Sequence, residues 1–212
     1  MRTSCCSPTA RCTGRARTLF VADVHLGKAA AFRAGGVPVP RGVTANDLAR
    51  LTALLDRTGT SRLVVLGDFL HAAAGRVPAL DVAFRAWRDR HPGLDVLLIR
   101  GNHDAHAGDP APHWGIAVVT EPHLAAPFLL CPAPQQPPTG YARCGHVHPA
   151  VRVGDGHDSV RLPCFVLGRR RALLPAFGRL TGLALIAPAP DERVIAIAGK
   201  ALFALPQPCA DS

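Results

Sequence analysis

Four short clusters of polar side chains combine residue types that bind divalent metal ions. They are Asp23-x-His25, Gly67-Asp68-x-x-His71, Gly101-Asn102-His103-Asp104 and Gly145-His146-Val147-His148. Carboxylates, imidazoles and amide oxygens are ligands for manganese, iron and zinc. Two such ions, about 3.5–4 Å apart, can clamp the attacking and leaving oxygens of a phosphoryl displacement. The combination predicts a site for two ions, with Asp68 as the ligand that they share.

The elements expected around these clusters would bring them together. Apolar strands are expected at residues 18–23, 62–68 and 94–104, with amphipathic helices between them at 44–59 and 78–93. Alternation of strand and helix predicts βαβ units around a parallel sheet. The carboxyl ends of parallel strands lie along one edge, so the first three clusters are expected to converge on one crevice. In the fourth cluster, two histidines at i and i+2 of an extended chain would point the same way into it.

The second half of the chain has a different pattern. Short β-like runs are broken by proline and glycine, and residues 132–138 form a proline-rich loop. This pattern predicts further, mostly antiparallel sheet that closes over the first half. The fold class is therefore α/β, with mixed β-sheets flanked by helices. We expect one domain over residues 18–205, a disordered basic tail at 1–17 and a short C-terminal tail at 206–212.

Composition limits the partners and the compartment. The 212 residues carry a net charge of +9, and the positive charge is almost all arginine, since lysine occurs only at positions 28 and 200. An arginine-rich surface favours phosphate groups as partners. No apolar stretch approaches the roughly 18 residues that a membrane span needs. The seven cysteines are scattered without metal-finger spacing, which predicts reduced thiols in a cytoplasmic protein.

Taken together, the motifs DVH, GDFLH, GNHD and GHVH resemble those of the calcineurin-like binuclear metallophosphoesterases, from about Thr18 to Leu205. Longer stretches, such as GNHDAHAGDP, GHVHPAVR and RLPCFVLG, are similar to the ligase-associated DNA damage response endonucleases of the PdeM type. The resemblance implies the metallophosphoesterase sandwich fold and a cytoplasmic, manganese-dependent phosphodiesterase that acts in DNA repair. It also implies single-stranded DNA as a substrate and functional association with an ATP-dependent DNA ligase and a helicase.

The resemblance implies a ligand set for each of two divalent ions, which would be manganese, with iron or zinc as alternatives. The first ion would be held by Asp23, His25, Asp68 and His148. The second would be held by Asp68, Asn102 and His146.

The resemblance also implies roles for two further histidines. His103 would be the catalytic residue, either as the general acid for the leaving oxygen or as an imidazolium that stabilises the phosphate charge. His71 would orient His103.

One position departs from the family pattern. Relatives supply a further histidine to the second metal from a turn that corresponds to LLCPAP, where this chain has Pro132. His113, His123 and Cys131 lie in or near the interval as possible substitutes. We therefore expect the second ion to bind more weakly than the first.

Two other functions stay open on the sequence. The chain could be a degenerate phosphoesterase that binds nucleic acid or a repair partner without turnover, or a phosphodiesterase for small nucleotides. Lys28, Arg33 and Arg143 flank the clusters and are the cations expected to meet phosphate groups.

Overall fold

A four-stranded parallel sheet forms the first layer of the protein. The computed structural model describes residues 17–155 and 158–206, so the expected tails lie almost wholly outside the described residues. The strands, in spatial order, are β1 (Thr18–Ala22), β2 (Arg62–Leu66), β3 (Asp95–Ile99) and β4 (Ala117–Val119). Ala22 pairs with Leu66, and Leu66 with Ile99. The first three strands therefore end level with one another, as the expected βαβ units require.

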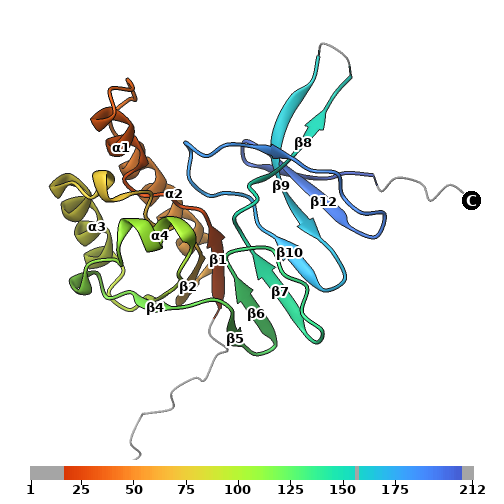
Figure 1. The fold of residues 1–212 in the computed structure, drawn as a ribbon, viewed down its shortest axis with the longest axis horizontal. Coiled ribbons are helices and arrows are strands. Elements are labelled where there is room, and N and C mark those ends of the chain that lie inside the picture. Colours follow the sequence, from red (N-terminus) through yellow and green to blue (C-terminus); the bar gives the residue numbers. More distant parts are fainter. Residues whose placement is uncertain (1–16, 156–157, 207–212) are drawn as a thin grey trace, which may run out of the picture.

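Helices cover one face of this sheet (Figure 1). They are α1 (Lys28–Ala34), α2 (Val43–Thr58), α3 (Pro78–Arg90) and α4 (Asn102–Ala107), with short 3-10 helices η1 (Ala73–Gly75) and η2 (Pro112–Trp114). The leucines of α2 and the aromatic residues of α3 are buried against β1–β3. Each fully buried side chain of this kind contributes roughly 1.5–3 kcal/mol. This face holds the largest aromatic cluster of the core, and it fixes where the strand ends lie.

A second, nine-stranded sheet packs on the opposite face of β1–β4. Its strands are β5 (His123–Ala125), β6 (Phe128–Cys131), β7 (Tyr141–Cys144), β8 (Pro149–Val153), β9 (Val160–Leu167), β10 (Arg171–Leu173), β11 (Ala184–Leu185), β12 (Arg193–Ala198) and β13 (Ala201–Ala204). Five of its strand pairs are antiparallel, whereas β6–β7, β7–β10 and β8–β11 are parallel. The prediction of mostly antiparallel sheet is confirmed, with three parallel exceptions.

The two sheets meet in a core of small and aliphatic residues. Ala22, Leu66 and Ile99 from the first sheet contact Leu130 and Leu174 from the second. Because side chains alternate along a strand, the neighbouring residues of the second sheet form a separate cluster on its other face. The expected α/β sandwich of mixed sheets flanked by helices is thus confirmed. None of the helices in the described residues is long and apolar enough to cross a membrane.

Candidate metal centre

The loops after β1 and β2 run side by side and carry the first two clusters. The Asp23 amide donates to the Gly67 carbonyl at 3.2 Å, and the His25 amide donates to the Asp68 carbonyl at 2.8 Å. The fourth cluster joins them, because the His146 amide donates to both oxygens of the Asp23 carboxylate, at 3.2 and 3.0 Å. Segments more than 120 residues apart in the chain are therefore held together at one sheet edge.

Five candidate side chains have an unusual backbone conformation. Within the described residues, the non-glycine residues with positive φ are Asp23, His25, Asp68, His146 and His148, with φ between 50° and 68°. Such conformations cost about 1–3 kcal/mol each and persist only where the surrounding structure enforces them. At Asp23, Asp68 and His146 this conformation falls within two residues after the end of a strand. All five are expected metal ligands, so the strained backbone coincides with the candidate site.

The first expected ligand set forms a compact group. The candidate ligand atoms of Asp23, His25 and His148 all lie within 4.8 Å of one another, and His148 Nε2 is 3.5 Å from Asp23 Oδ1. His25 is 4% exposed, yet neither of its ring nitrogens has a hydrogen-bond partner among the described residues. Burial, with the nearby Lys28 and three histidines, lowers the pKa of His25 to about 2. A neutral, buried imidazole with free lone-pair electrons beside a carboxylate fits a metal ligand.

Asp68 lies between the two expected ligand sets. Its Oδ2 is 4.0 Å from His146 Nδ1, while its Oδ1 accepts a hydrogen bond from the His103 amide at 2.9 Å. Burial and the neighbouring Asp23 carboxylate raise the pKa of Asp68. Two close, buried carboxylates favour a positive charge between them, which a divalent cation would supply.

Asn102, by contrast, makes no side-chain hydrogen bond to the other candidates among the described residues. It is exposed at the first position of α4, directly before His103. Its carbonyl accepts a hydrogen bond from His106 Nδ1 at 2.6 Å, and its side chain makes no hydrogen bond in the described part of the chain. The structure places Asn102 next to the site without showing how it would bind an ion.

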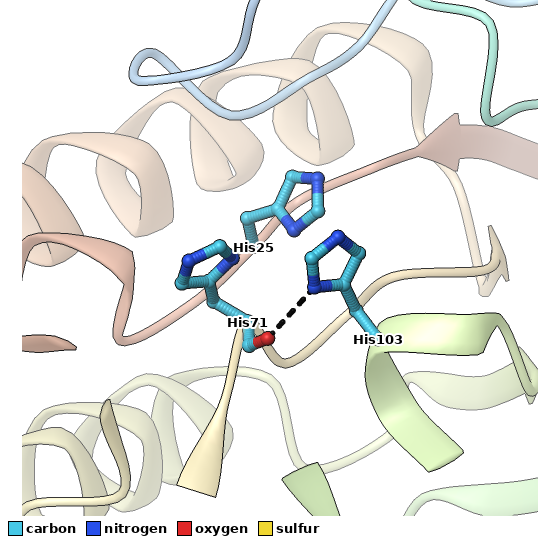
Figure 2. A group of neighbouring side chains, drawn as sticks. All are labelled: His25, His71 and His103. Atoms are coloured by element: carbon cyan, nitrogen blue, oxygen red, sulfur yellow. Dashed lines mark hydrogen bonds between the residues drawn. The ribbon is translucent and has the colours of Figure 1, made fainter. Parts of the chain in front are cut away.

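Three histidines, His25, His71 and His103, form a second group of possible metal ligands (Figure 2). The ring nitrogens of His25, His71 and His103 lie within 4.8 Å of one another. His103 Nδ1 donates to the His71 backbone carbonyl at 2.9 Å, and the two rings stack with centroids 5.0 Å apart. A carbonyl can only accept, so this bond places a proton on Nδ1 and leaves Nε2 of a neutral His103 as an acceptor. His71 thus contacts His103 through its backbone oxygen and its ring face. The sequence predicted only that His71 orients His103 and did not specify the contact.

Pro132 stands where the family resemblance implies a histidine ligand for the second metal ion. It follows β6, and its carbonyl accepts the Gly145 amide at 2.9 Å. A Cβ atom on Gly67 would lie 2.6 Å from Pro132 Cβ, so the proline ring fills the space beside the Asp68 loop. Proline offers no metal ligand at this position.

Two of the suggested substitutes for the missing histidine are wrong. His113 is exposed and contacts Asp81 Oδ1 at 2.6 Å, on the helical side of the first sheet. Cys131 is fully buried in the cluster on the far face of the second sheet, and burial raises its thiol pKa to about 12. Alternation along β6 explains this, because Cys131 and its neighbour Leu130 point to opposite faces. His123 lies on β5 and belongs to neither group of possible ligands.

Arg143 also differs from the prediction that it meets phosphate. Its guanidinium stacks between the rings of Phe20 and Phe128, at 4.3 and 4.0 Å from their centroids. Burial lowers its pKa. Arg143 therefore joins the two sheets and does not flank the crevice. Lys28 does lie beside the site, where burial lowers its pKa and the nearby Asp68 and Asp23 carboxylates oppose that shift.

Asp104 is a structural residue of the site that sequence reasoning did not identify. It is fully buried, and its two carboxylate oxygens accept the Leu70 amide at 2.8 Å and the Gly101 amide at 3.0 Å. It thereby ties the loop after β3 to the loop after β2. A carboxylate three residues after Gly101, at the start of a helix, is a capping-box signature that could have indicated this contact.

Comparisons with known proteins agree with this geometry. Residues 16–150 match the family model described as calcineurin-like phosphoesterase. The crystal structure of a Pseudomonas putida nuclease named MPE is 44% identical in sequence, with a TM-score of 0.77, over 89% of this chain and 87% of that one. A phosphoesterase from E. coli named Yfce aligns with 14% identity and a TM-score of 0.41, over 87% of this chain and 90% of that one, which is too distant to carry weight. A search of curated proteins finds no match.

Proposed function

Because this chain belongs to the calcineurin-like phosphoesterase family, we propose that it is a metal-dependent phosphodiesterase that cuts nucleic acid. The family uses a binuclear metal centre, and the chain carries candidate histidine and aspartate ligand groups. The observation that carries the proposal is the group formed by Asp23, His25 and His148. The buried imidazole of His25 has no hydrogen-bond partner among the described residues.

Each ion has its own proposed ligands. Asp23, His25, Asp68 and His148 would hold the first, and Asp68, Asn102 and His146 the second. When bound, the ions supply charge that stabilises the phosphoryl group and lowers the pKa of an attacking water. Manganese is the proposed ion, as the family resemblance implies, and iron or zinc could take the same carboxylate and imidazole ligands. The second site would bind more weakly, because Pro132 stands beside it in place of a ligand.

His103 is the proposed general acid. Its Nδ1 is held by the His71 carbonyl, so the ring has a fixed orientation and its Nε2 is the atom that can carry a second proton to the leaving oxygen. The His103 amide donates to Asp68, which couples the position of the acid to that of the shared ligand. Lys28, beside the two carboxylates, would add positive charge near the phosphate.

Nucleic acid is the proposed substrate, with single-stranded DNA in DNA repair as the specific case. The net charge of +9 favours a polyanion, and the Pseudomonas putida protein is described as a nuclease. The proposal places residues 18–205 in one catalytic domain, in the cytoplasm, in functional association with a DNA ligase and a helicase. The resemblance of the GNHDAHAGDP and GHVHPAVR stretches supports these points.

The test is hydrolysis of bis-p-nitrophenyl phosphate and of a labelled single-stranded oligonucleotide with manganese. Asp68→Ala and His103→Ala should each lower kcat at least about 100-fold, since each removes a group that acts on the reacting phosphate. The matched controls are Asp89→Ala and His123→Ala, which change the same residue types outside the site. Activity that survives both site substitutions would refute the assignment.

A second candidate function follows from Pro132: a phosphoesterase that has lost turnover and binds nucleic acid. Oligonucleotide binding that weakens with salt, without cleavage under any metal, would favour it. Cleavage of cyclic nucleotides in preference to the oligonucleotide would instead favour a phosphodiesterase for small nucleotides.

A further inference from the structure

A hollow beside the candidate metal centre is not used by the chemistry described above. It lies between α1 and the N-terminal ends of α2 and α3 and has a volume of about 410 Å³. Its lining includes Arg33, Arg41, Thr44, Val77 and Ala79. Small side chains from three helices leave this space open, since alanine predominates in the lining.

The hollow continues toward the metal centre. A much smaller cavity, of about 10 Å³, is lined by His25 and Lys28 and by the start of α2. The two spaces share the residues Gly27, Ala29, Val43 and Thr44. The shared lining places the open hollow next to the small cavity that His25 and Lys28 line.

The charge around these two spaces is positive. Lys28, Arg33 and Arg41 line them, and no acidic side chain lines the larger hollow. The acid that lines the smaller cavity, Asp47, is buried and forms an ion pair with Arg50 at 3.3 Å. Arg41 is exposed and has no hydrogen-bond or ion-pair partner among the residues that the structure describes. Its guanidinium is therefore available to a ligand.

We propose that this hollow binds the nucleic-acid strand on one side of the phosphate that is cut, with Arg41 contacting its backbone phosphates. Arg33, whose Nη1 already donates to the Val39 and Pro40 carbonyls at 3.3 Å, adds positive charge beside it. The inference rests on the proposed function and extends it by assigning a strand-binding surface. Charge complementarity and the position next to the candidate metal centre identify the occupant as an extended polyanion that also reaches the site.

The lining also predicts how the strand is read. Thr44 and the guanidinium groups offer polar contacts to phosphate and sugar, while the alanines and Val77 offer apolar contact to sugars. No aromatic side chain lines the hollow, so bases have no ring to stack on. The strand would therefore be held through its backbone, with little dependence on base sequence.

The charge test compares a long and a short substrate. Arg41→Glu should raise KM for a single-stranded oligonucleotide about tenfold and leave kcat/KM for bis-p-nitrophenyl phosphate within about twofold, because the small diester does not reach the hollow. Arg161→Glu, on an exposed position of β9, makes the same change of net charge elsewhere and should leave both values unchanged. Equal effects of the two substitutions would overturn the proposal, since net charge alone would then explain them.

Salt dependence gives a readout that does not need turnover. In a manganese-loaded His103→Ala background, oligonucleotide binding is measured by fluorescence anisotropy at several salt concentrations. Arg41→Glu should reduce the slope of log K against log salt by at least about 0.7, the value for one phosphate contact with a single strand. An unchanged slope would overturn the contact.

A steric test separates shape from charge. Ala79→Phe fills the exposed lining at the start of α3, whereas Ala86→Phe adds the same ring on the same helix outside the hollow. Only Ala79→Phe should raise KM for the oligonucleotide, and neither should affect the small diester. If Ala79→Phe lowers activity on both substrates equally, the hollow is not a surface separate from the active site. If the wild-type protein cuts neither substrate, the proposed function fails, and the salt slope of Arg41→Glu still decides the hollow.

Discussion

Neither ring nitrogen of His25 has a hydrogen-bond partner among the described residues. The residue is 4% exposed, and burial together with Lys28 and the neighbouring histidines lowers its pKa to about 2. In the unfolded chain the pKa would return to its ordinary 6.5. Between about pH 2 and pH 6.5, the ring is therefore protonated mainly in the unfolded chain and neutral in the folded protein.

The sign of the resulting pH dependence follows. The neutral ring contributes its full stability above pH 6.5, and that contribution is lost as pH falls, because the unfolded state then binds a proton that the folded state does not. Metal-free protein should lose about 1.4 kcal/mol of unfolding free energy per pH unit below 6 through this ring. His25→Asn, which tolerates the same backbone conformation without titrating, should remove that part of the slope. Urea unfolding of both proteins at pH 6 and pH 5 measures this change in unfolding free energy. Equal pH dependence of the wild-type protein and His25→Asn would contradict the expectation.

Pro132 allows a test of the weaker second metal site. After dialysis against manganese-free buffer, the wild-type protein should retain closer to one ion per chain than two. Pro132→His would add an imidazole beside Gly67 and Gly145 and should raise retention toward two ions. Pro134→His, at an exposed position of the same loop, is the control and should change nothing. Two tightly held ions in the wild-type protein would show that the proline does not weaken the site.

At the scale of elements, the site depends on how the loops after β2 and β3 are tied together. Asp104 makes this connection with one carboxylate oxygen to each loop, and burial raises its pKa. Asp104→Ala leaves the Leu70 and Gly101 amides buried without acceptors, at about 1–3 kcal/mol each. We expect about 3 kcal/mol less unfolding free energy, together with lower activity on the small diester as the loops separate.

Asp89→Ala is the matched control, because Asp89 carries the same charge on the exposed face of α3. Its unfolding midpoint in urea should stay within about 0.5 kcal/mol of wild type. A similarly small effect of Asp104→Ala would mean that the two loops hold their positions without this carboxylate.

The order of the main elements and the clustering of the candidate ligands could be predicted because both depend on local patterns. Short apolar runs that end in glycine and a polar residue mark the strand ends, and parallel strands gather those ends at one edge. The helix α1 was not predicted, since it has seven residues and buries only Ala29. The strands β5 and β10 were missed because three residues carry too little pattern.

Side-chain contacts across the site could not be predicted in this way. The Asp104–Leu70 contact depends on the turns of two different loops. The Arg143 prediction was wrong because residue order does not say which face of β7 meets the other sheet.

At the scale of the whole molecule, two sheets must stay in register for the fourth cluster to reach the first three. Arg143 spans their interface, stacked between Phe20 of β1 and Phe128 of β6. Arg143→Ala should lower the unfolding free energy by about 2 kcal/mol, through the loss of both cation–π contacts and of the packed side chain. Thermal or urea unfolding measures this effect, and kcat/KM for bis-p-nitrophenyl phosphate should not change.

Two comparisons make that outcome specific. Arg193→Ala removes an exposed arginine from β12 and should leave stability within about 0.5 kcal/mol. Arg143→Met restores the packing without the charge and should recover part of the loss. If Arg143→Ala instead impaired catalysis and left stability intact, a role at the phosphate would regain support.

The left-handed turns at Asp23, His25, Asp68, His146 and His148 limit what evolution can substitute there. Glycine would relax each of them, and few residues other than asparagine, aspartate and histidine enter that region readily. At His25, His146 and His148, whose side chains make no hydrogen bond among the described residues, a lineage released from catalysis would relieve backbone strain with the first glycine to arise. This chain instead keeps a side chain with a possible metal-ligand atom at all five positions, despite the strained backbone. That retention is easier to reconcile with continued turnover than with a scaffold that only binds.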